Sequence, residues 1–496
     1  MLTRDEVATH DSASSCWVII DGNCYDVTDM INDHPGGRDA VLRHAGKDAT
    51  EDFIPIHPSD TLHKHLPKEK HLGPVKPDNK RKEVMNHVLV AKSGDSKDMP
   101  LKLCQNLLDM EAQASKVLSE RAFTYFHSAA DSLGALRANE RDWSRVSFRP
   151  RVLRNVVDAD MSCRIMGQSS RLPIFIAPMA MIRLADDEGE LAFARAASSH
   201  GIPYAISTYS SYSHDEVMQC VNDEGLGRMQ MFQLYVPRRR ENAIQLIHKA
   251  RRLGFRSLLV TVDTPVVGKR EEDDRYKARV EYQSGVADTP RTADISDSDD
   301  KPVLRGVHSS TLNWEDISWI RGAWGDSGPI ILKGIQSAED ALLAYHAGVD
   351  GIYLSNHGGR QLDFAPSALQ TLLEIRKFCP IIIGKLQIYV DGGVRRGSDV
   401  LKAICLGATA VGLGRPFVYA LGAYGRKGVE RAIERKDSNY DNLLTQVAVL
   451  SDEIETTMRL LGANKLSDLS PHYVNTKELE HYLIESVDRK EAKARL

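Results

Sequence analysis

Eight short apolar runs, each separated from the next by a segment of about helix length, constrain the fold of this chain most. They are read as strands over 174–177, 204–206, 231–235, 257–262, 330–332, 351–354, 388–390 and 410–413. Near-continuous apolar strands that alternate with helices indicate parallel strands buried on both faces. Eight such units predict an α/β fold, a (β/α)8 barrel. A doubly wound sheet is the alternative, but no GxGxxG motif follows the first strand.

The N-terminal region is rich in histidine, with seven of the 17 histidines before residue 75. His34 opens the string HPGG, and His57 follows a short helix-like stretch. A flat macrocycle held on both faces needs one axial imidazole from each side, and apolar walls. The candidate walls are Ile31, Val41, Leu42, Phe53, Ile54 and Leu62. HPGG taken alone is explained equally well as a tight turn.

The wider N-terminal string is more specific than HPGG. It runs from Trp17-Val-Ile through Tyr25-Asp-Val-Thr and HPGG to Ala45-Gly-Lys-Asp-Ala-Thr and His57. In this order, residues 1–75 resemble the cytochrome b5 haem-binding domain, a small α+β fold. The resemblance implies that His34 and His57 are the metal ligands of haem b. Residues 76–100, which are polar with prolines near both ends, are expected to form a linker.

Polar residues collect at the carboxyl ends of the eight apolar runs. They are Ser207, Thr208, Gln233, Tyr235, Thr261, Asp263, Lys333, Ser355, Asn356, His357, the run from Asp391 to Arg395, Gly414 and Arg415. In a barrel these ends converge on the one face where active sites form. Strands also end in serines and threonines for purely structural reasons, but that explanation suits a lysine, a His–Asp set and two arginines poorly.

Chemical roles follow from the residue types on that face. Gly392-Gly393 and Gly414-Arg415 supply N–H groups and a guanidinium where barrels bind phosphate. His357 is a candidate proton acceptor, and Asp263 a candidate partner that fixes its tautomer. Arg360 offers a planar fork for a carboxylate, and Lys333 a positive charge beside a ring that gains electrons. Each of these side chains alone is also explained by burial or ion pairing.

Residues 101–475 resemble the FMN-dependent 2-hydroxy acid oxidase and dehydrogenase family. The strings FQLYV, TVDTP, LKG, SNHGGRQLD, VDGGVRRG and GLGRPF occur in family order. The resemblance implies FMN contacts from Pro178, Met179, Ala180, Ser207, Gln233, Thr261, Lys333 and Ser355, with the phosphate at Asp391, Gly392, Gly393, Val394, Arg395, Gly414 and Arg415. It implies substrate contacts from Tyr125, Tyr235, Arg270, His357 and Arg360, and catalytic roles for His357, Asp263 and Tyr235.

Four features depart from the family pattern. Met179 stands where a small residue or threonine is usual, and Ala129 replaces a glycine. An extra stretch occupies 435–449, and a C-terminal tail, 476–496, is shorter than usual.

The two resemblances together predict a haem- and FMN-containing dehydrogenase. It would oxidise an L-2-hydroxy acid, with L-lactate expected, and pass electrons from FMN through haem b to cytochrome c or a similar acceptor. Two alternatives stay open. One is a flavin oxidase that produces hydrogen peroxide, and the other is a haem-binding electron carrier on a barrel that does not catalyse.

Composition excludes several other classes. The 64 basic residues against 68 acidic residues give a net charge of −4, which does not indicate a nucleic-acid partner. No uncharged apolar run approaches the ~18 residues of a membrane span. The sequence shows no presequence, so we expect a soluble protein of the cytoplasm or the mitochondrial intermembrane space. The family resemblance further implies a homotetramer.

Overall fold

The structure is a computed structural model that describes residues 1–31, 34, 38–76, 99–227, 229–283, 305–433 and 449–486. The chain divides into two compact units, one formed by 1–100 with 279–305 and the other by 101–278 with 306–496. Most of the expected linker, residues 77–98, lies outside the described residues, and so does most of the extra stretch, residues 435–448. Within the described ranges, none of the helices combines the length and apolarity that a bilayer-spanning segment needs.

The N-terminal unit is a four-stranded sheet with short helices, in the order β1-β2-β3-β4. Its elements are α1 (Arg4–Ala8), β1 (Asp11–Ser12), β2 (Ser15–Ile20), β3 (Asn23–Asp26), η1 (Thr28–Met30), α2 (Arg38–Leu42), α3 (Thr50–Phe53), α4 (Thr61–His65), η2 (Lys68–Lys70) and β4 (His71–Pro74). The sheet alternates its apolar side chains between two clusters. Cys16, Val18 and Ile20 of β2 belong to one cluster, and Ile19 belongs to the other. This period of two is the pattern of a strand that is covered on both faces.

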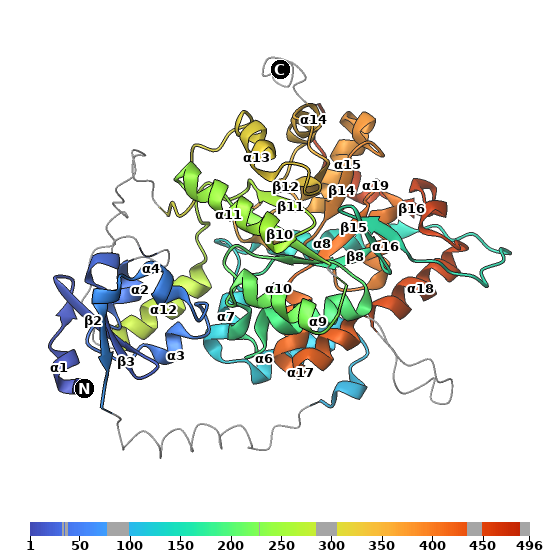
Figure 1. The fold of residues 1–496 in the computed structure, drawn as a ribbon. Helices are drawn as coiled ribbons and strands as arrows, with labels where there is room; N and C mark the ends of the chain where they lie inside the picture. Colours follow the sequence, from blue (N-terminus) through green and yellow to red (C-terminus); the bar gives the residue numbers. More distant parts are fainter. Residues whose placement is uncertain are drawn as a thin grey trace. The chain divides into compact units, whose positions relative to one another are not determined.

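The larger unit is a closed barrel of eight parallel strands, which confirms the predicted fold (Figure 1). The strands are β8 (Ile174–Ile176), β9 (Tyr204–Ile206), β10 (Gln230–Tyr235), β11 (Leu258–Thr261), β12 (Ile330–Ile335), β13 (Gly351–Leu354), β14 (Gln387–Val390) and β15 (Ala410–Leu413). Val411 of β15 pairs with Ile174 of β8, which closes the barrel. Each of the eight apolar runs overlaps one of these strands.

Helices surround the strands. After β8 to β11 come α9 (Gly189–His200), α10 (His214–Asp223), α11 (Arg240–Leu253) and α13 (Asp316–Trp324). Helix α12 (Glu271–Gln283) also follows β11, but its residues from Arg279 onward belong to the other compact unit. After β12 to β15 come α14 (Ala338–His346), α15 (Ala368–Phe378), α16 (Gly397–Cys405), α17 (Arg415–Ile433) and α18 (Leu450–Leu461). Their ends follow capping chemistry, because Ser213 begins α10 in a capping box with Glu216, and Gly254 ends α11 in the left-handed conformation.

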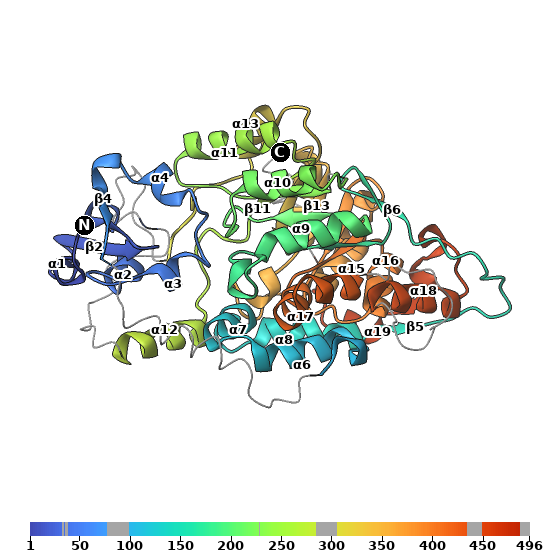
Figure 2. The ribbon, with the colours of Figure 1, turned by 60° about the horizontal axis from the view of Figure 1, so that its bottom comes forward.

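Helices that precede the barrel pack against its outer layer and reach its carboxyl face. They are α6 (Leu107–Val117), α7 (Glu120–His127) and α8 (Gly134–Ser144), preceded by η3 (Leu101–Leu103). Helix α17 lies between α6 and α9 (Figure 2). At the other end of the chain, β16 (Val474–Asn475) pairs with β5 (Ser147–Phe148), and α19 (Lys477–Glu480) follows. The described part of the expected tail is therefore folded onto the barrel unit.

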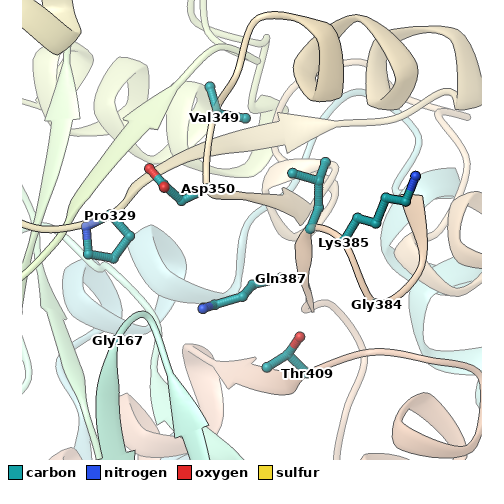
Figure 3. Close-up of a pocket in the computed structure, with 9 residues that line it drawn as sticks. Gly167, Pro329, Val349, Asp350, Gly384, Lys385, Gln387 and Thr409 are labelled. Carbon is teal, nitrogen blue, oxygen red and sulfur yellow. The ribbon is translucent and has the colours of Figure 1, made fainter. Parts of the chain in front are cut away.

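The amino end of the barrel is closed by a hairpin, β6 (Cys163–Ile165) and β7 (Gln168–Ser170). Met166 at its tip is fully buried in the barrel interior, and its N–H donates to the hydroxyl of Tyr389 at 2.8 Å. A hollow of about 600 Å³ lies beside this hairpin, lined by residues at the amino ends of β12 to β15 (Figure 3). Chemistry at the carboxyl ends of the strands is therefore at the opposite end of the barrel.

Gly393 permits an unusually close approach between the loop after β14 and α8. A Cβ on Gly393 would lie 1.9 Å from the carbonyl oxygen of Asn139, and its φ is +75°. Trp143 fixes the same contact, because its indole N–H donates to the carbonyl of Gly392 at 2.8 Å. This glycine pair is thus required for packing, whatever ligand the loop binds.

We predict that Gly393→Ala destabilises the barrel unit by several kcal/mol, because a positive φ costs ~1–2 kcal/mol and the close approach must open as well. Gly384→Ala is the matched control, since Gly384 has a φ of +80° but open space around it. The measurement is the temperature at which each variant releases its flavin, followed by flavin fluorescence. Equal losses in the two variants would contradict the packing argument.

Candidate functional site

His357 occupies the turn after β13, in η5 (His357–Gly359), with a left-handed φ of 59°. A non-glycine residue pays for this conformation and keeps it only where the surroundings impose it. Here the backbone N–H of His357 donates to the hydroxyl of Ser355 at 3.0 Å, and the carbonyl of Gly359 accepts from the N–H of Ala130 at 2.8 Å. The imidazole is therefore held at the carboxyl end of the barrel by both flanking segments.

Asp263 lies between the inner nitrogen of His357 and the ammonium group of Lys333. Nδ1 of His357 lies 3.0 Å from Oδ1 of Asp263, and Nζ of Lys333 lies 3.6 Å from Oδ2. Burial alone raises the pKa of Asp263, but the charge of Lys333 and then the interaction with His357 outweigh it and hold this pKa well below its usual range. Because Asp263 is ionised, it accepts the Nδ1 proton and leaves Nε2 of His357 as the basic nitrogen.

The outer nitrogen of His357 faces Tyr235 at the end of β10. Nε2 lies 3.1 Å from the Tyr235 hydroxyl. Burial lowers the pKa of His357 to about 4, and burial raises that of Tyr235 far above its usual value. At neutral pH the site therefore holds a neutral imidazole and a neutral phenol, the states in which one accepts a proton and the other donates a hydrogen bond.

Arg360 and Arg270 place positive charge beside this pair. Nη1 of Arg360 donates to the carbonyl of Tyr125 at 2.9 Å and to that of Ser128 at 2.6 Å, and the guanidinium lies 5.3 Å from the centre of the Tyr125 ring. Burial lowers the pKa of Arg360 to about 9, which still leaves it charged. Nε of Arg270 is buried without a partner among the described residues. This unpaired charge fits a substrate carboxylate.

The residues predicted to contact the flavin ring and its side chain form a buried polar cluster. Nζ of Lys333 lies 3.4 Å from the hydroxyl of Ser355, which donates to Oδ2 of Asp391 at 3.1 Å. Gln233 donates to the hydroxyl of Thr261 at 2.8 Å. Oδ1 of Asp391 is buried without a partner within the described ranges. A buried acceptor of this kind fits the hydroxyl-bearing side chain of FMN.

At the predicted phosphate end, the arginines and the glycines differ in how they are hydrogen-bonded. Both arginines are bonded to the chain itself: Arg395 to Glu111 at 3.1 Å and Glu140 at 3.2 Å, and Arg415 to the carbonyls of Phe126, Gly358 and Ser128. The N–H groups of Gly392, Gly393 and Val394 have no hydrogen-bond partner among the described residues. These backbone N–H groups are therefore open to a phosphate, while the two arginines are already held in place by the chain.

The segment after β8 carries Pro178, Met179 and Ala180. Sδ of Met179 lies beside Gly414, where a Cβ would come within 2.9 Å of it. Ser207 is buried after β9, and its hydroxyl accepts from the N–H of Tyr209 at 3.1 Å. Met179 and Ala129, the two substitutions that depart from the family pattern, are both accommodated by the packing. Met179 fills space beside Gly414, and Ala129 is fully buried.

A second site lies in the N-terminal unit. The rings of His34 and His57 lie 5.8 Å apart between centroids, close to what one metal ion between two imidazoles requires, since each metal–nitrogen bond is ~2 Å. Nδ1 of His57 lies 3.1 Å from the carbonyl of Phe53, so this nitrogen carries the proton and Nε2 is left for a metal. Ile31, Val41, Leu42, Phe53 and Leu62 pack in one apolar cluster. These residues fit a haem with two histidine ligands.

A model of the FMN-dependent dehydrogenase family matches residues 114–476, and a model of the cytochrome b5-like haem/steroid binding domain matches residues 3–76. The chain therefore belongs to the FMN-dependent dehydrogenases, and a cytochrome b5-like domain precedes the barrel in the sequence. FMN and haem b are the cofactors of these two domains.

Similar proteins match either nearly the whole chain or about three quarters of it. The chain is 38% identical to an L-lactate dehydrogenase (cytochrome) of Wickerhamomyces anomalus, over 97% of this chain and 81% of that protein. It is 36% identical to glycolate oxidase of Spinacia oleracea, over 74% of this chain and 95% of that one. Among solved structures, an arginine-to-lysine variant of flavocytochrome b2 has a TM-score of 0.67 at 32% identity, covering 83% of this chain and 97% of that chain.

Two residues at the site were not among the predicted set. His308 and Tyr209 lie against Tyr235, with His308 stacked on its ring at 4.4 Å between centroids. The family resemblance marks Tyr209 only as a side-chain pocket position that varies between substrates, and the structure places its ring against Tyr235. His308 follows a long polar segment and no strand, so the sequence pattern offered no signal for it.

We predict that the second-order rate constant of anaerobic flavin reduction by a 2-hydroxy acid stays constant between pH 8 and about 5. It should fall with a midpoint near pH 4, because His357 has a pKa of about 4 and accepts a proton only above it. Rapid pH-jump mixing, with circular dichroism as a check on folding, makes this measurement. A midpoint near the ordinary histidine value of 6.5 would show that the imidazole is not desolvated as described.

Proposed function

We propose that this chain oxidises an L-2-hydroxy acid to the 2-oxo acid and passes the electrons from FMN to haem b and on to cytochrome c. The observation that supports it best is the neutral His357, bonded to Asp263 on one side and Tyr235 on the other, beside the charges of Arg360 and Arg270. L-Lactate is the substrate in the names of two relatives that span nearly the whole chain, from Wickerhamomyces anomalus and Saccharomyces cerevisiae.

In this proposal each side chain has a distinct task. Arg360, Arg270 and Tyr125 bind the substrate carboxylate, which orients the hydroxyl carbon toward Nε2 of His357. The imidazole accepts a proton from the substrate, and Asp263 stabilises the imidazolium that forms. Tyr235 hydrogen-bonds the substrate hydroxyl. FMN supplies the two-electron acceptor, and Lys333 lies where its charge favours a ring that gains electrons.

Haem b supplies a one-electron carrier, and its ligands lie in a different compact unit from the barrel. The two units therefore divide substrate oxidation from onward electron transfer. A homotetramer and a location in the mitochondrial intermembrane space or cytoplasm belong to the same proposal and rest on the family resemblance.

A flavin oxidase is the second candidate function. It is favoured by the match of the barrel to glycolate oxidases, which are 36% identical over about three quarters of this chain. Stoichiometric hydrogen peroxide during aerobic turnover, without cytochrome c reduction, would support it over the dehydrogenase.

We predict that His357→Gln binds FMN but loses ~10²–10⁴-fold in the rate of flavin reduction by substrate, because the proton acceptor is removed. The readout is anaerobic bleaching of the flavin, with the FMN content of the purified protein as the control for folding. Near-normal bleaching in this variant would remove His357 from the catalytic role.

We predict that His34→Ala still bleaches its flavin with substrate at near the wild-type rate, because Arg360, His357 and the flavin residues all belong to the barrel unit. Cytochrome c reduction should fall steeply, since the one-electron carrier has lost a ligand. His65→Ala is the matched control, because His65 is exposed in the same domain. Survival of cytochrome c reduction in His34→Ala would contradict the proposed electron path.

A further inference from the structure

Two aromatic side chains, Tyr209 and His308, pack against the ring of Tyr235. His308 stacks on the Tyr235 ring at 4.4 Å between centroids and an interplanar angle of 3°, and Tyr209 stacks on Tyr235 at 5.5 Å. The hydroxyl of Tyr209 lies 3.3 Å from Nδ1 of His308. Tyr209 and His308 are thus hydrogen-bonded to each other and packed against the residue that faces His357.

The position of His308 is fixed from both sides. The N–H of Ser309 donates to the carbonyl of Val236 at 2.9 Å, and the guanidinium of Arg238 donates to the carbonyl of Gly306. These contacts tie the segment 306–309 to the residues that follow β10. The imidazole is therefore placed by the same strand end that places Tyr235.

Tyr209 is held by the loop after β9, which a buried carboxylate anchors. Oε1 of Glu190 accepts from the N–H of Ser211 at 2.8 Å and from that of Ile182 at 3.2 Å, and Oε2 accepts from the Ser211 hydroxyl at 2.7 Å. The N–H of Met181 also donates to the carbonyl of Tyr209. The loops after β8 and β9 are therefore locked together, and Tyr209 is pre-positioned.

The Tyr209–His308 pair has hydrogen-bonding capacity left over. His308 is 6% exposed, and burial lowers its pKa to about 4, so the imidazole is neutral. Its Nδ1 is used by Tyr209, and its Nε2 has no hydrogen-bond partner among the described residues. A neutral imidazole carries one donor and one acceptor. In either tautomer the pair therefore offers one donor and one acceptor to a third group.

The directions of a bound hydroxy acid follow from the proposed function. Its carboxylate points to Arg360 and Arg270, and its hydroxyl points to His357 and Tyr235. The remaining substituent on the hydroxyl carbon then lies toward the cluster that covers the Tyr235 ring. A plain methyl group there would leave the Nε2 of His308 without a partner after water is displaced.

We propose that Tyr209 and His308 bind a hydroxyl group on C3 of the substrate, so that the preferred substrate is a short L-2,3-dihydroxy acid of the glycerate type rather than L-lactate. This inference rests on the proposed oxidation of an L-2-hydroxy acid and specifies the side chain. A hydroxyl both donates and accepts, so it satisfies the pair in either tautomer.

The test compares two substrates that differ by one hydroxyl. Anaerobic flavin reduction of the full-length holoenzyme gives a second-order rate constant for L-glycerate and for L-lactate. We expect the ratio of glycerate to lactate to be about tenfold or more, since a site built to bond a hydroxyl discriminates against the analogue that lacks it. Dissociation constants of the two products, hydroxypyruvate and pyruvate, from perturbation of the oxidised flavin spectrum should show the same order.

Tyr209→Phe removes the hydroxyl and keeps the ring, and His308→Leu removes both ring nitrogens. Each should lower the glycerate-to-lactate ratio about tenfold. Tyr212→Phe is the matched control, because its hydroxyl belongs to the same loop but donates to the carbonyl of Asp187 at 3.0 Å. This control should leave the ratio unchanged. FMN content reports folding in every variant, and the product dissociation constants provide a second measurement for any variant that reduces slowly.

The outcomes separate the inference from the function on which it rests. Fast flavin reduction by L-lactate with a ratio near or below one overturns the inference and leaves the proposed function intact. A preference for a dicarboxylic acid such as L-malate also overturns it, because a carboxylate calls for a charged His308. Reduction by another 2-hydroxy acid but by neither of these two overturns the inference alone, and no reduction by any 2-hydroxy acid overturns the proposed function and the inference together. A high ratio that falls in Tyr209→Phe and His308→Leu, but not in Tyr212→Phe, supports it.

Discussion

The buried carboxylate of Asp263 determines the electrostatics of the whole barrel site. A charge without solvent is tolerated only where it is paired, and here Lys333 lies 3.6 Å from one oxygen and His357 lies 3.0 Å from the other. The same pairing fixes the tautomer of His357 and directs its basic nitrogen to Tyr235. Gly334 lets this arrangement form, since a Cβ on that residue would lie 2.6 Å from the Cβ of Asp263. Loss of the carboxylate would therefore remove the partner of Lys333 and that of His357 at once.

Backbone carbonyls of the helices that precede the barrel organise the cationic side of the site. Arg360 and Arg415, from different strand ends, both donate to the carbonyl of Ser128. The end of α7 is a ready acceptor for such groups, because the last carbonyls of a helix have no partner within it. These contacts close the carboxyl face of the barrel with helices that are distant in sequence. Arg270 differs from these two arginines, because its Nε is buried without a hydrogen-bond partner within the described ranges.

The barrel and the residues around His357 could be predicted from the sequence. The partners of the arginines and the position of His308 could not, because a sequence pattern does not specify long-range contacts. The eight strands were found because a parallel strand covered on both faces must be apolar throughout. Asp263, Lys333 and His357 were found because strand ends converge on one face of a barrel. A sequence pattern does not show which acceptors a guanidinium will pair with, so the ion pairs of Arg395 with Glu111 and Glu140 were not predicted. His308 was missed because its position is set by hydrogen bonds to the chain after β10 rather than by any periodicity.

The site therefore contains two groups of residues that differ in how well they would tolerate substitution. The groups around His357 are interlocked, because replacing one changes the charge or tautomer of its neighbours, and such networks respond to substitution as a unit. Tyr209 and His308 bond to each other and stack on Tyr235 at the edge of that network, and no ion pair with it involves either of them within the described residues. A change of side chain at these two positions would alter what lies next to the substrate while Asp263, Lys333 and His357 keep their contacts. Residues at such positions can change the substrate of an enzyme without changing its reaction. In this chain the two positions are occupied by the polar side chains of Tyr209 and His308.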